Sequence, residues 1–251
     1  MTYFKYKNKD IYYKEYSNCG EPLILLHGNT ASSVMFELLL PLYTPYFKVI
    51  LIDFLGNGKS ERVDDFAKEM WYDQALQTIA LIEHLGYEKV NLLGTSGGAY
   101  TALNAALERP DLIKKVIADS FDGRDFHQGW MSGLIRDRVQ AVHDPQASQF
   151  YAWCQGDDWK DIVEKDTMAL VRYVKENVPI YHHPLKNLQV PYLMVGSVED
   201  ELLRNDLEEE YHGIADEVGH GMIEMYPHGE HPMVLSNAEA FALSAKAFFQ
   251  S

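Results

Sequence analysis

The sequence contains few of the residues on which several protein classes depend. Cysteine occurs twice in 251 residues, as Cys19 and Cys154, which supply neither a disulfide framework nor a set of zinc ligands. No run of eighteen apolar residues occurs, so no membrane-spanning helix is expected. The segment 1–7 lacks an apolar core followed by a small-residue cleavage site. We therefore expect no secretion signal, and a cytoplasmic protein with reduced thiols.

Positive charge is also scarce. Lys and Arg together number 22 against 37 Asp and Glu, which gives a formal net charge of -15. Nucleic-acid binding needs clustered cations, and an anionic membrane surface would repel this chain, so we expect neither as a partner. The charge is typical of a soluble surface and identifies no substrate. The oligomeric state stays open.

Short apolar runs recur along the chain. Residues 3–16 alternate apolar and polar side chains around a turn at residues 8–10, which predicts a β-hairpin. Later runs are too short for helices, and their nearly continuous apolar character is typical of strands buried on both faces of a parallel sheet. These runs occupy residues 22–26, 49–52, 90–93, 116–118, 192–195 and 222–225.

Helical patterns lie between these runs. One helix is predicted from Trp71 to about Leu85, a second over 99–107, and a third that begins at a capping box of Ser236 and Glu239. Strand and helix alternate, which predicts an α/β fold with a doubly wound, mostly parallel sheet and an antiparallel start. We expect a single domain over residues 1–251.

One region lacks strand patterns, at about residues 121–185. It is predicted to form a small helical cap insert over the sheet edge, which sets substrate preference and contributes no catalytic group. We expect most of its aromatic side chains to pack it onto the body, and one or two to line a pocket. These aromatics are Trp130, Phe150, Tyr151, Trp153, Trp159 and Tyr173.

The clearest chemical signal is Gly-Thr-Ser-Gly-Gly at residues 94–98. It follows the predicted strand 90–93 and precedes the helix that starts at Ala99, which is the strand–turn–helix setting of a G-x-S-x-G nucleophile. Such a tight turn needs small neighbours and exposes the serine hydroxyl at the sheet edge. The N–H groups at the start of the helix face any developing oxyanion. These features predict Ser96 as the nucleophile.

A serine needs a base, and two later loops offer one together with an acid. The loop after the run ending at 195 holds Glu199 and Asp200, and the loop after the run ending at 225 holds His228 and His231. Both loops follow predicted strands, so they can emerge at the same edge of the sheet as Ser96. The order of serine, acid and histidine suits a G-x-S-x-G hydrolase.

The chain resembles the α/β-hydrolase family, in its esterase-like serine hydrolase branch, over nearly its whole length. Leu-His-Gly-Asn at 26–29 is similar to the family's His-Gly-x oxyanion loop, and residues 53–60 are similar to its D-x-x-G-x-G-x-S turn. The spacing from His231 to Phe241 resembles the family's G-H…E-x-F ending. The resemblance implies the α/β-hydrolase fold, with an oxyanion hole formed by the backbone N–H groups of Asn29 and Gly97.

Two positions depart from the family pattern. Glu230 stands where the family usually has Gly, so His228 is a rival base, although its spacing to the later motif residues fits less well than that of His231. The position at which the family often places its acid holds Glu199. Asp200 is followed by a similar apolar pair, so we favour Asp200 and keep Glu199 as the alternative acid.

The implied chemistry is hydrolysis of a carboxylic ester of a small to medium acyl substrate, through a Ser96–His231–Asp200 triad and an acyl-enzyme. No cofactor is expected, because no G-x-G-x-x-G opens a helix, and no metal, because His228 and His231 lack a third ligand. Thioester, amide and carbon–carbon bond hydrolysis use the same triad, so the bond stays open.

Two other functions remain. An aminopeptidase of the proline iminopeptidase type would bind a substrate amine through acidic residues of the insert, although such enzymes usually have a bulky residue where this chain has Gly97. A non-catalytic ligand-binding receptor on the same fold is the other. The candidate amine-binding acids are Asp157, Asp158, Asp161 and Glu164.

Overall fold

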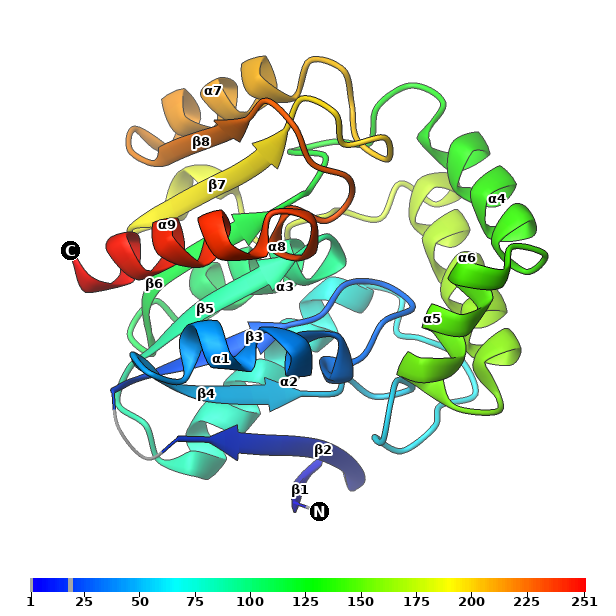
Figure 1. The fold of residues 1–251 in the computed structure, drawn as a ribbon, viewed down its shortest axis with the longest axis horizontal. Coiled ribbons are helices and arrows are strands. Elements are labelled where there is room, and N and C mark those ends of the chain that lie inside the picture. Colours follow the sequence, from blue (N-terminus) through cyan, green and yellow to red (C-terminus); the bar gives the residue numbers. More distant parts are fainter. Residues whose placement is uncertain (1, 18–19) are drawn as a thin grey trace.

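The computed structural model describes residues 2–17 and 20–251. Over this part of the chain it shows one eight-stranded sheet, in the order β1-β2-β4-β3-β5-β6-β7-β8 (Figure 1). β1 and β2 form the predicted antiparallel hairpin, β2 pairs antiparallel with β4, and the remaining pairs are parallel. The doubly wound, mostly parallel sheet is thereby confirmed. The strands are β1 Thr2–Tyr6, β2 Lys9–Tyr16, β3 Glu21–Leu26, β4 Phe47–Ile52, β5 Val90–Thr95, β6 Ile113–Asp119, β7 Tyr192–Ser197 and β8 Met222–Tyr226.

The central strands bury both faces, because alternate side chains point to opposite sides. In β3, Leu23 and Leu25 pack into one hydrophobic cluster, and Ile24 and Leu26 pack into the other. This explains why the strand has a continuous apolar run. β8 is an edge strand, and its Met222 is 57% exposed. The prediction of burial on both faces was therefore wrong for this run.

Helices cover both faces of the sheet. In Figure 1, α2 and α3 lie behind the sheet, while α1 and α9 lie in front of it. The body elements are η1 Ser33–Leu39, α1 Leu40–Tyr43, α2 Met70–Leu85, α3 Gly97–Glu108, η2 Leu185–Asn187, α7 Leu207–Val218, α8 Met233–Ser236 and α9 Ala238–Gln250. The sequence patterns did not predict η1, α1, η2, α7 or α8. α2 ends at Gly86, whose φ of 71° gives the left-handed cap that glycine adopts readily.

The predicted capping box does not form at the last helix. α9 begins after Asn237, which makes no side-chain cap hydrogen bond. The Ser236 hydroxyl instead donates to the Glu230 carbonyl at 2.7 Å, because Ser236 already belongs to α8. Because α8 precedes α9 directly, the Ser236 hydroxyl is not placed to cap α9.

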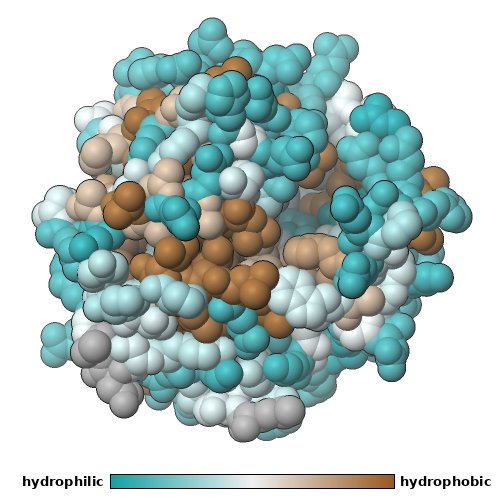
Figure 2. All heavy atoms as spheres, in the orientation of Figure 1, coloured by the Kyte–Doolittle hydropathy of each residue, from teal (hydrophilic) through white to brown (hydrophobic). Residues whose placement is uncertain are grey.

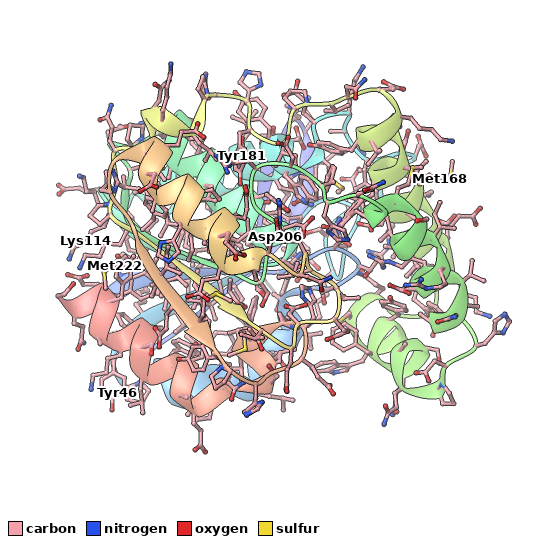
Figure 3. All side chains as sticks on the ribbon, turned by 90° about the horizontal axis from the view of Figure 1, so that it is seen from above. Tyr46, Lys114, Met168, Tyr181, Asp206 and Met222 are labelled. Atoms are coloured by element: carbon pink, nitrogen blue, oxygen red, sulfur yellow. The ribbon has the colours of Figure 1, made fainter. Side chains whose placement is uncertain are left out.

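Three helices lie between β6 and β7, within the range expected for the cap. They are α4 Trp130–Ala141, α5 Pro145–Gln155 and α6 Trp159–Lys175, and they sit beyond the carboxyl ends of the strands (Figure 1). Seen from above, Met168 on α6 lies at the opposite end of the molecule from Lys114 and Met222 (Figure 3). Among the residues described, no helix combines the length and apolar character needed to cross a membrane.

Candidate active site

Ser96 occupies a sharp turn between β5 and α3. Its φ of 55° and ψ of −122° are rare for a residue with a side chain, and such strain costs about 1–3 kcal/mol. The neighbouring glycines make the turn sterically feasible. A Cβ on Gly94 would lie 2.0 Å from the Gly98 carbonyl oxygen, and one on Gly98 would lie 2.2 Å from that of Leu26. Local sterics thus bring Ser96 to the carboxyl edge of the sheet.

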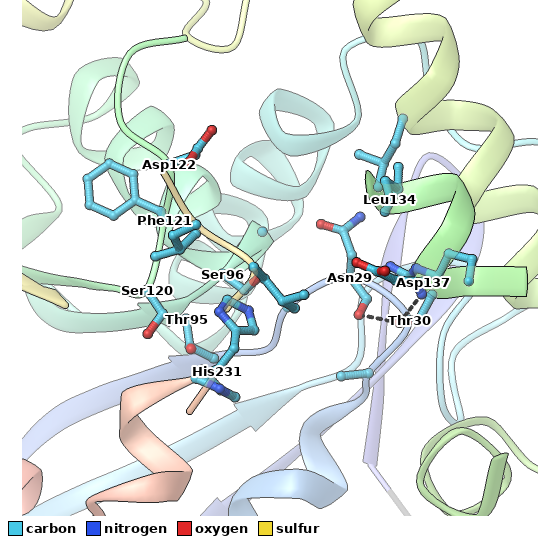
Figure 4. Close-up of a pocket in the computed structure, with 18 of the residues that line it drawn as sticks. Asn29, Thr30, Thr95, Ser96, Ser120, Phe121, Asp122, Leu134, Asp137 and His231 are labelled. Atoms are coloured by element: carbon cyan, nitrogen blue, oxygen red, sulfur yellow. Dashed lines mark hydrogen bonds between the residues drawn. The ribbon is translucent and has the colours of Figure 1, made fainter. Parts of the chain in front are cut away.

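His231 and Asp200 meet at the same edge, from the loops after β8 and β7. The His231 Nδ1 atom lies 2.9 Å from Oδ2 and 3.1 Å from Oδ1 of Asp200. The pair is nearly closed to solvent, with side-chain exposures of 12% and 0%. His231 lines the same cavity as Ser96, and Figure 4 shows its ring beside that residue. Since Nδ1 faces the carboxylate, Nε2 is the ring nitrogen that remains for another partner.

The electrostatics around His231 favour a proton on the imidazole. Burial lowers the pKa of His231, but the hydrogen bond to Asp200 and the charges of Asp200, Asp119 and Glu201 together raise it above 6.5. Burial also raises the pKa of Asp119 to about 7, although Thr95 donates a hydrogen bond to that carboxylate at 2.7 Å. A base whose protonated form is stabilised in this way accepts the serine proton more readily.

The rival acid and the rival base pair with each other. The His228 Nδ1 atom lies 2.9 Å from Oε1 of Glu199, and the two side chains are 79% and 57% exposed. Glu199 therefore does not face His231. His228 is not among the residues that line the cavity at Ser96.

The loop of residues 27–30 passes directly beside Ser96. A Cβ on Gly28 would lie 3.0 Å from the Ser96 Cβ, and both Gly28 and Asn29 line the cavity. Gly97 is the first residue of α3, where backbone N–H groups have no partner within the helix. In residues 2–17 and 20–251, neither the Asn29 nor the Gly97 N–H donates to a backbone carbonyl outside helices and strands. Both are available to an anion.

The turn at residues 53–60 contacts this loop and the segment that follows it, and the Phe54 N–H donates to His27 Nε2 at 3.2 Å. The Asp53 carboxylate accepts from the Ser33 N–H at 2.7 Å and from the Lys59 N–H at 2.8 Å. A Cβ on Gly58 would lie 2.2 Å from the same carboxylate, so a larger residue does not fit. The turn thus ties two loops of the sheet edge together.

A cavity of about 620 Å³ opens at Ser96 between the body and the cap. In the space-filling view, the surface is hollowed beside the cap, and hydrophobic side chains are visible there (Figure 2). The cap supplies Trp130, Phe150 and Tyr151 to the wall, which is one more aromatic than expected. The body and the cap also contribute Met35, Trp71, Phe121, Leu134, Leu170, Leu202, Leu203 and Leu235.

Comparison with known proteins identifies the family. Residues 21–168 match the family model described as the alpha/beta hydrolase fold, which is more than half of the chain. The chain belongs to the α/β-hydrolase family. It is 25% identical over 226 residues to the uncharacterized hydrolase YugF of Bacillus subtilis, covering 81% of this chain and 82% of that protein.

Two further proteins are similar to this α/β-hydrolase, one in sequence and one in structure. Over 128 residues it is 35% identical to a proline iminopeptidase of Clostridium botulinum, which covers 48% of this chain and only 42% of that enzyme. An α/β-hydrolase from a Medee basin deep-sea metagenome library has the same fold, with a TM-score of 0.77 and 19% identity over 100% of this chain and 98% of that one. The relatives are hydrolases.

The acidic residues proposed to bind a substrate amine lie on the outer surface of this α/β-hydrolase. Asp158 pairs with Arg62 at 2.8 Å, and Asp161 pairs with Lys165 at 2.8 Å. These acids are exposed, and none lines the cavity at Ser96: Asp157, Asp158, Asp161 and Glu164. The structure therefore does not bring them to the nucleophile.

Two cap residues near the site were missed by sequence reasoning. Asp166 on α6 is 2% exposed, and its Oδ2 accepts from the Asn29 Nδ2 at 2.7 Å. Arg138 on α4 lines the cavity. A signal for Asp166 was present, because it interrupts the apolar stripe of α6 at helical spacing from Ile162 and Leu170. A carboxylate on such a stripe must find a buried partner.

The thiols and the side chains that could bind a metal ion are considered next. Cys154 is a free, buried thiol, and burial raises its pKa to about 11, which makes it a poor nucleophile. Cys19 lies outside the described residues. Within the described residues, no three His, Cys, Asp or Glu side chains are grouped as metal ligands.

Proposed function

We propose that this α/β-hydrolase is a serine esterase in which Ser96 is the nucleophile, His231 the general base and Asp200 the acid that orients the imidazole. One observation carries the proposal. Ser96, in its strained turn, and His231, which is paired with the buried Asp200, line the same largely apolar cavity, beside two N–H groups that are free to bind an oxyanion. Nucleophilic catalysis at a carbonyl requires this combination of groups.

The reaction follows from these positions. The Ser96 Oγ attacks the ester carbonyl while His231 Nε2 takes its proton, and the N–H groups of Asn29 and Gly97 stabilise the oxyanion. His231 then passes the proton to the leaving alcohol as the ester bond breaks, which leaves an acyl-Ser96. Water attacks this acyl group with His231 again acting as base, and the carboxylic acid departs.

The cavity supports an acyl substrate of small to medium size. Its volume of about 620 Å³ lies within the range of ordinary small-molecule sites, and its wall is rich in aromatic and aliphatic side chains. The aminopeptidase alternative receives no such support, because its candidate acids are exposed and two of them form ion pairs elsewhere.

Labelling with a fluorophosphonate tests the assignment. The label should map to Ser96, and Ser96→Ala should abolish both labelling and ester turnover without changing the melting temperature. A label on Ser60 or Ser197, or turnover that survives in Ser96→Ala, would contradict the proposal. Tight ligand binding without turnover in the natural chain would instead favour a receptor.

A series of p-nitrophenyl esters tests the role of the cap. Trp130 lines the cavity, whereas Trp153 is 45% exposed and is not among the lining residues. Trp130→Ala should change the ratio of kcat/KM between short and long acyl chains by about tenfold, since apolar walls discriminate by ~1–3 kcal/mol per methylene. Trp153→Ala is the matched control and should leave the ratio unchanged. Equal ratios in both variants would show that Trp130 does not shape the acyl site.

A further inference from the structure

A buried carboxylate in the cap is left unused by the proposed triad. Asp166 belongs to α6, is 2% exposed, and accepts a hydrogen bond from the Asn29 side chain at 2.7 Å across the boundary between cap and body. Its other carboxylate oxygen faces Arg138 of α4 at 3.4 Å. A buried charge is stable only when it is paired and hydrogen-bonded. The loop of the body supplies the shorter of these two contacts.

The cap also contacts Thr30, the residue that follows Asn29 in the loop. Thr30 has a φ of 57°, a left-handed conformation that is unusual for a β-branched residue and costs about 1–3 kcal/mol. The Arg138 guanidinium donates to the Thr30 hydroxyl oxygen at 2.5 Å, and that hydroxyl donates to the Asn29 carbonyl at 2.6 Å. Figure 4 shows the hydrogen bonds that meet at Thr30. Hydrogen bonds from the cap thus hold Asn29 and Thr30, two consecutive residues of a strained loop.

The far end of the Asn29 side chain is fixed as well. Its Oδ1 accepts from the Trp71 Nε1–H at 3.1 Å. This contact lies directly against the start of α3, because a Cβ on Gly97 would be 2.0 Å from the Asn29 Oδ1 and 2.8 Å from the Trp71 Nε1. A larger residue at Gly97 would therefore displace Asn29. The Asn29 amide group thus links the cap carboxylate of Asp166 to Trp71, directly beside Gly97.

We propose that Asp166 is a positioning residue for catalysis, which holds Asn29 and the strained backbone at Thr30 so that the Asn29 N–H faces the oxyanion. This inference rests on the proposed function. It extends the role of the cap, because the cap then determines the geometry of the oxyanion hole as well as the shape of the acyl site. Asp166 touches no reacting atom and acts through Asn29.

Kinetics of three single variants test this role. Asp166→Ala and Asn29→Ala should each lower kcat for a p-nitrophenyl ester by about 10- to 100-fold, somewhat less than the loss of a whole oxyanion donor, with little change in KM. Asp161→Ala is the matched control, because Asp161 lies on the same helix but is exposed and pairs with Lys165. It should leave both constants unchanged.

Inhibition by an alkyl trifluoromethyl ketone separates positioning from simple structural support. Ser96 adds to its carbonyl, His231 accepts the serine proton, and the carbonyl oxygen becomes an oxyanion. Its affinity should fall in Asp166→Ala by the same factor as kcat, while the affinity of the matching methyl ketone should change little. A purely structural role would weaken both ketones alike or lower only the melting temperature, and either result would overturn the inference.

The double variant Asp166→Ala/Asn29→Ala completes the test. It should be no slower than the slower single variant, because both changes remove one shared contact. Independent, multiplicative losses would overturn the inference. If Asp166→Ala does not fold, Asn29→Ala leaves the Asp166–Arg138 pair in place and must show the same split between kcat and KM.

Fluorophosphonate labelling of the natural chain distinguishes failure of the proposed function from failure of the positioning role. No label at Ser96 would overturn the proposed function together with the inference. A normal label, combined with unchanged kinetics in Asp166→Ala, would overturn only the positioning role.

Discussion

Two histidine–carboxylate pairs lie on neighbouring loops of this molecule, and their closest contacts are equally long. His231 faces Asp200 at 2.9 Å, and His228 faces Glu199 at 2.9 Å. Their surroundings differ completely. The first pair has side-chain exposures of 12% and 0%, and the second has exposures of 79% and 57%. Distance alone therefore does not distinguish the proposed triad pair from a surface ion pair.

Burial and neighbours make the difference. In water the mutual attraction of a surface pair is screened and contributes ~0–1 kcal/mol. The buried pair is closed to solvent, and its carboxylate raises the pKa of His231 against the opposing effect of burial. His231 of this pair also lines the cavity that contains Ser96. Two His–carboxylate contacts of equal length thus support different chemistry, because one is buried and the other is exposed.

The largest expected difference between the pairs is in turnover when the histidine is removed. His231→Ala should lower kcat by about 10⁶-fold, because the serine loses its base. His228→Ala should stay within about twofold of the natural chain, since an exposed pair contributes little. Steady-state hydrolysis of a p-nitrophenyl ester measures both. A severe loss in His228→Ala would reverse the assignment of the base.

Removing the carboxylates should give the next largest contrast. Asp200→Asn should lower kcat by about 10⁴-fold, because the imidazole loses the group that fixes its tautomer. Glu199→Gln should have a much smaller effect, since Glu199 contacts only the exposed His228 among these groups. The same ester assay compares the two variants. The opposite order of effects would make Glu199 the functional acid.

The pH dependence should also separate the pairs. His231 acts as a base only when neutral, so kcat/KM should fall as pH drops through its pKa, which lies above 6.5. Asp119 and Glu201 also face His231 and favour its charged form. In Asp200→Asn the main raising effects are lost while burial remains, so the acid limb should move to lower pH. Glu199→Gln is the control, and an equal shift in it would show that both carboxylates act on His231.

The smallest expected effect is on stability. Glu199→Gln should change the free energy of unfolding by less than ~1 kcal/mol, and added salt should reduce even this difference, because the pair is exposed and screened. Urea denaturation at low and high salt measures it. A loss above ~2 kcal/mol would mean that the His228–Glu199 pair closes the two loops, and the contrast with His231–Asp200 would weaken.

The choice between Asp200 and Glu199 shows where prediction from sequence stops. The two residues are adjacent, and family spacing alone favoured Glu199, while the following leucines favoured Asp200. In the structure, the turn after β7 directs the two carboxylates to different histidines. There the Ser197 hydroxyl accepts from the Glu199 N–H at 3.1 Å, and Glu199 meets His228 while Asp200 meets His231. The conformation of this turn depends on the neighbouring β8 loop, which no local pattern describes.

The sequence by itself determined the strands, the helices α2, α3 and α9, and the tight turn at Ser96. Strand and helix periodicities are local, and the turn at 94–98 depends on sterics between residues a few positions apart, such as Gly94 and Gly98. Only the tertiary structure decided which histidine meets which acid, and that Asp166 holds Asn29. Asn29 and Asp166 lie 137 positions apart in the chain. Their contact depends on how the cap docks on the body, because packing between distant segments is set by the whole fold and leaves no periodic signal in either segment.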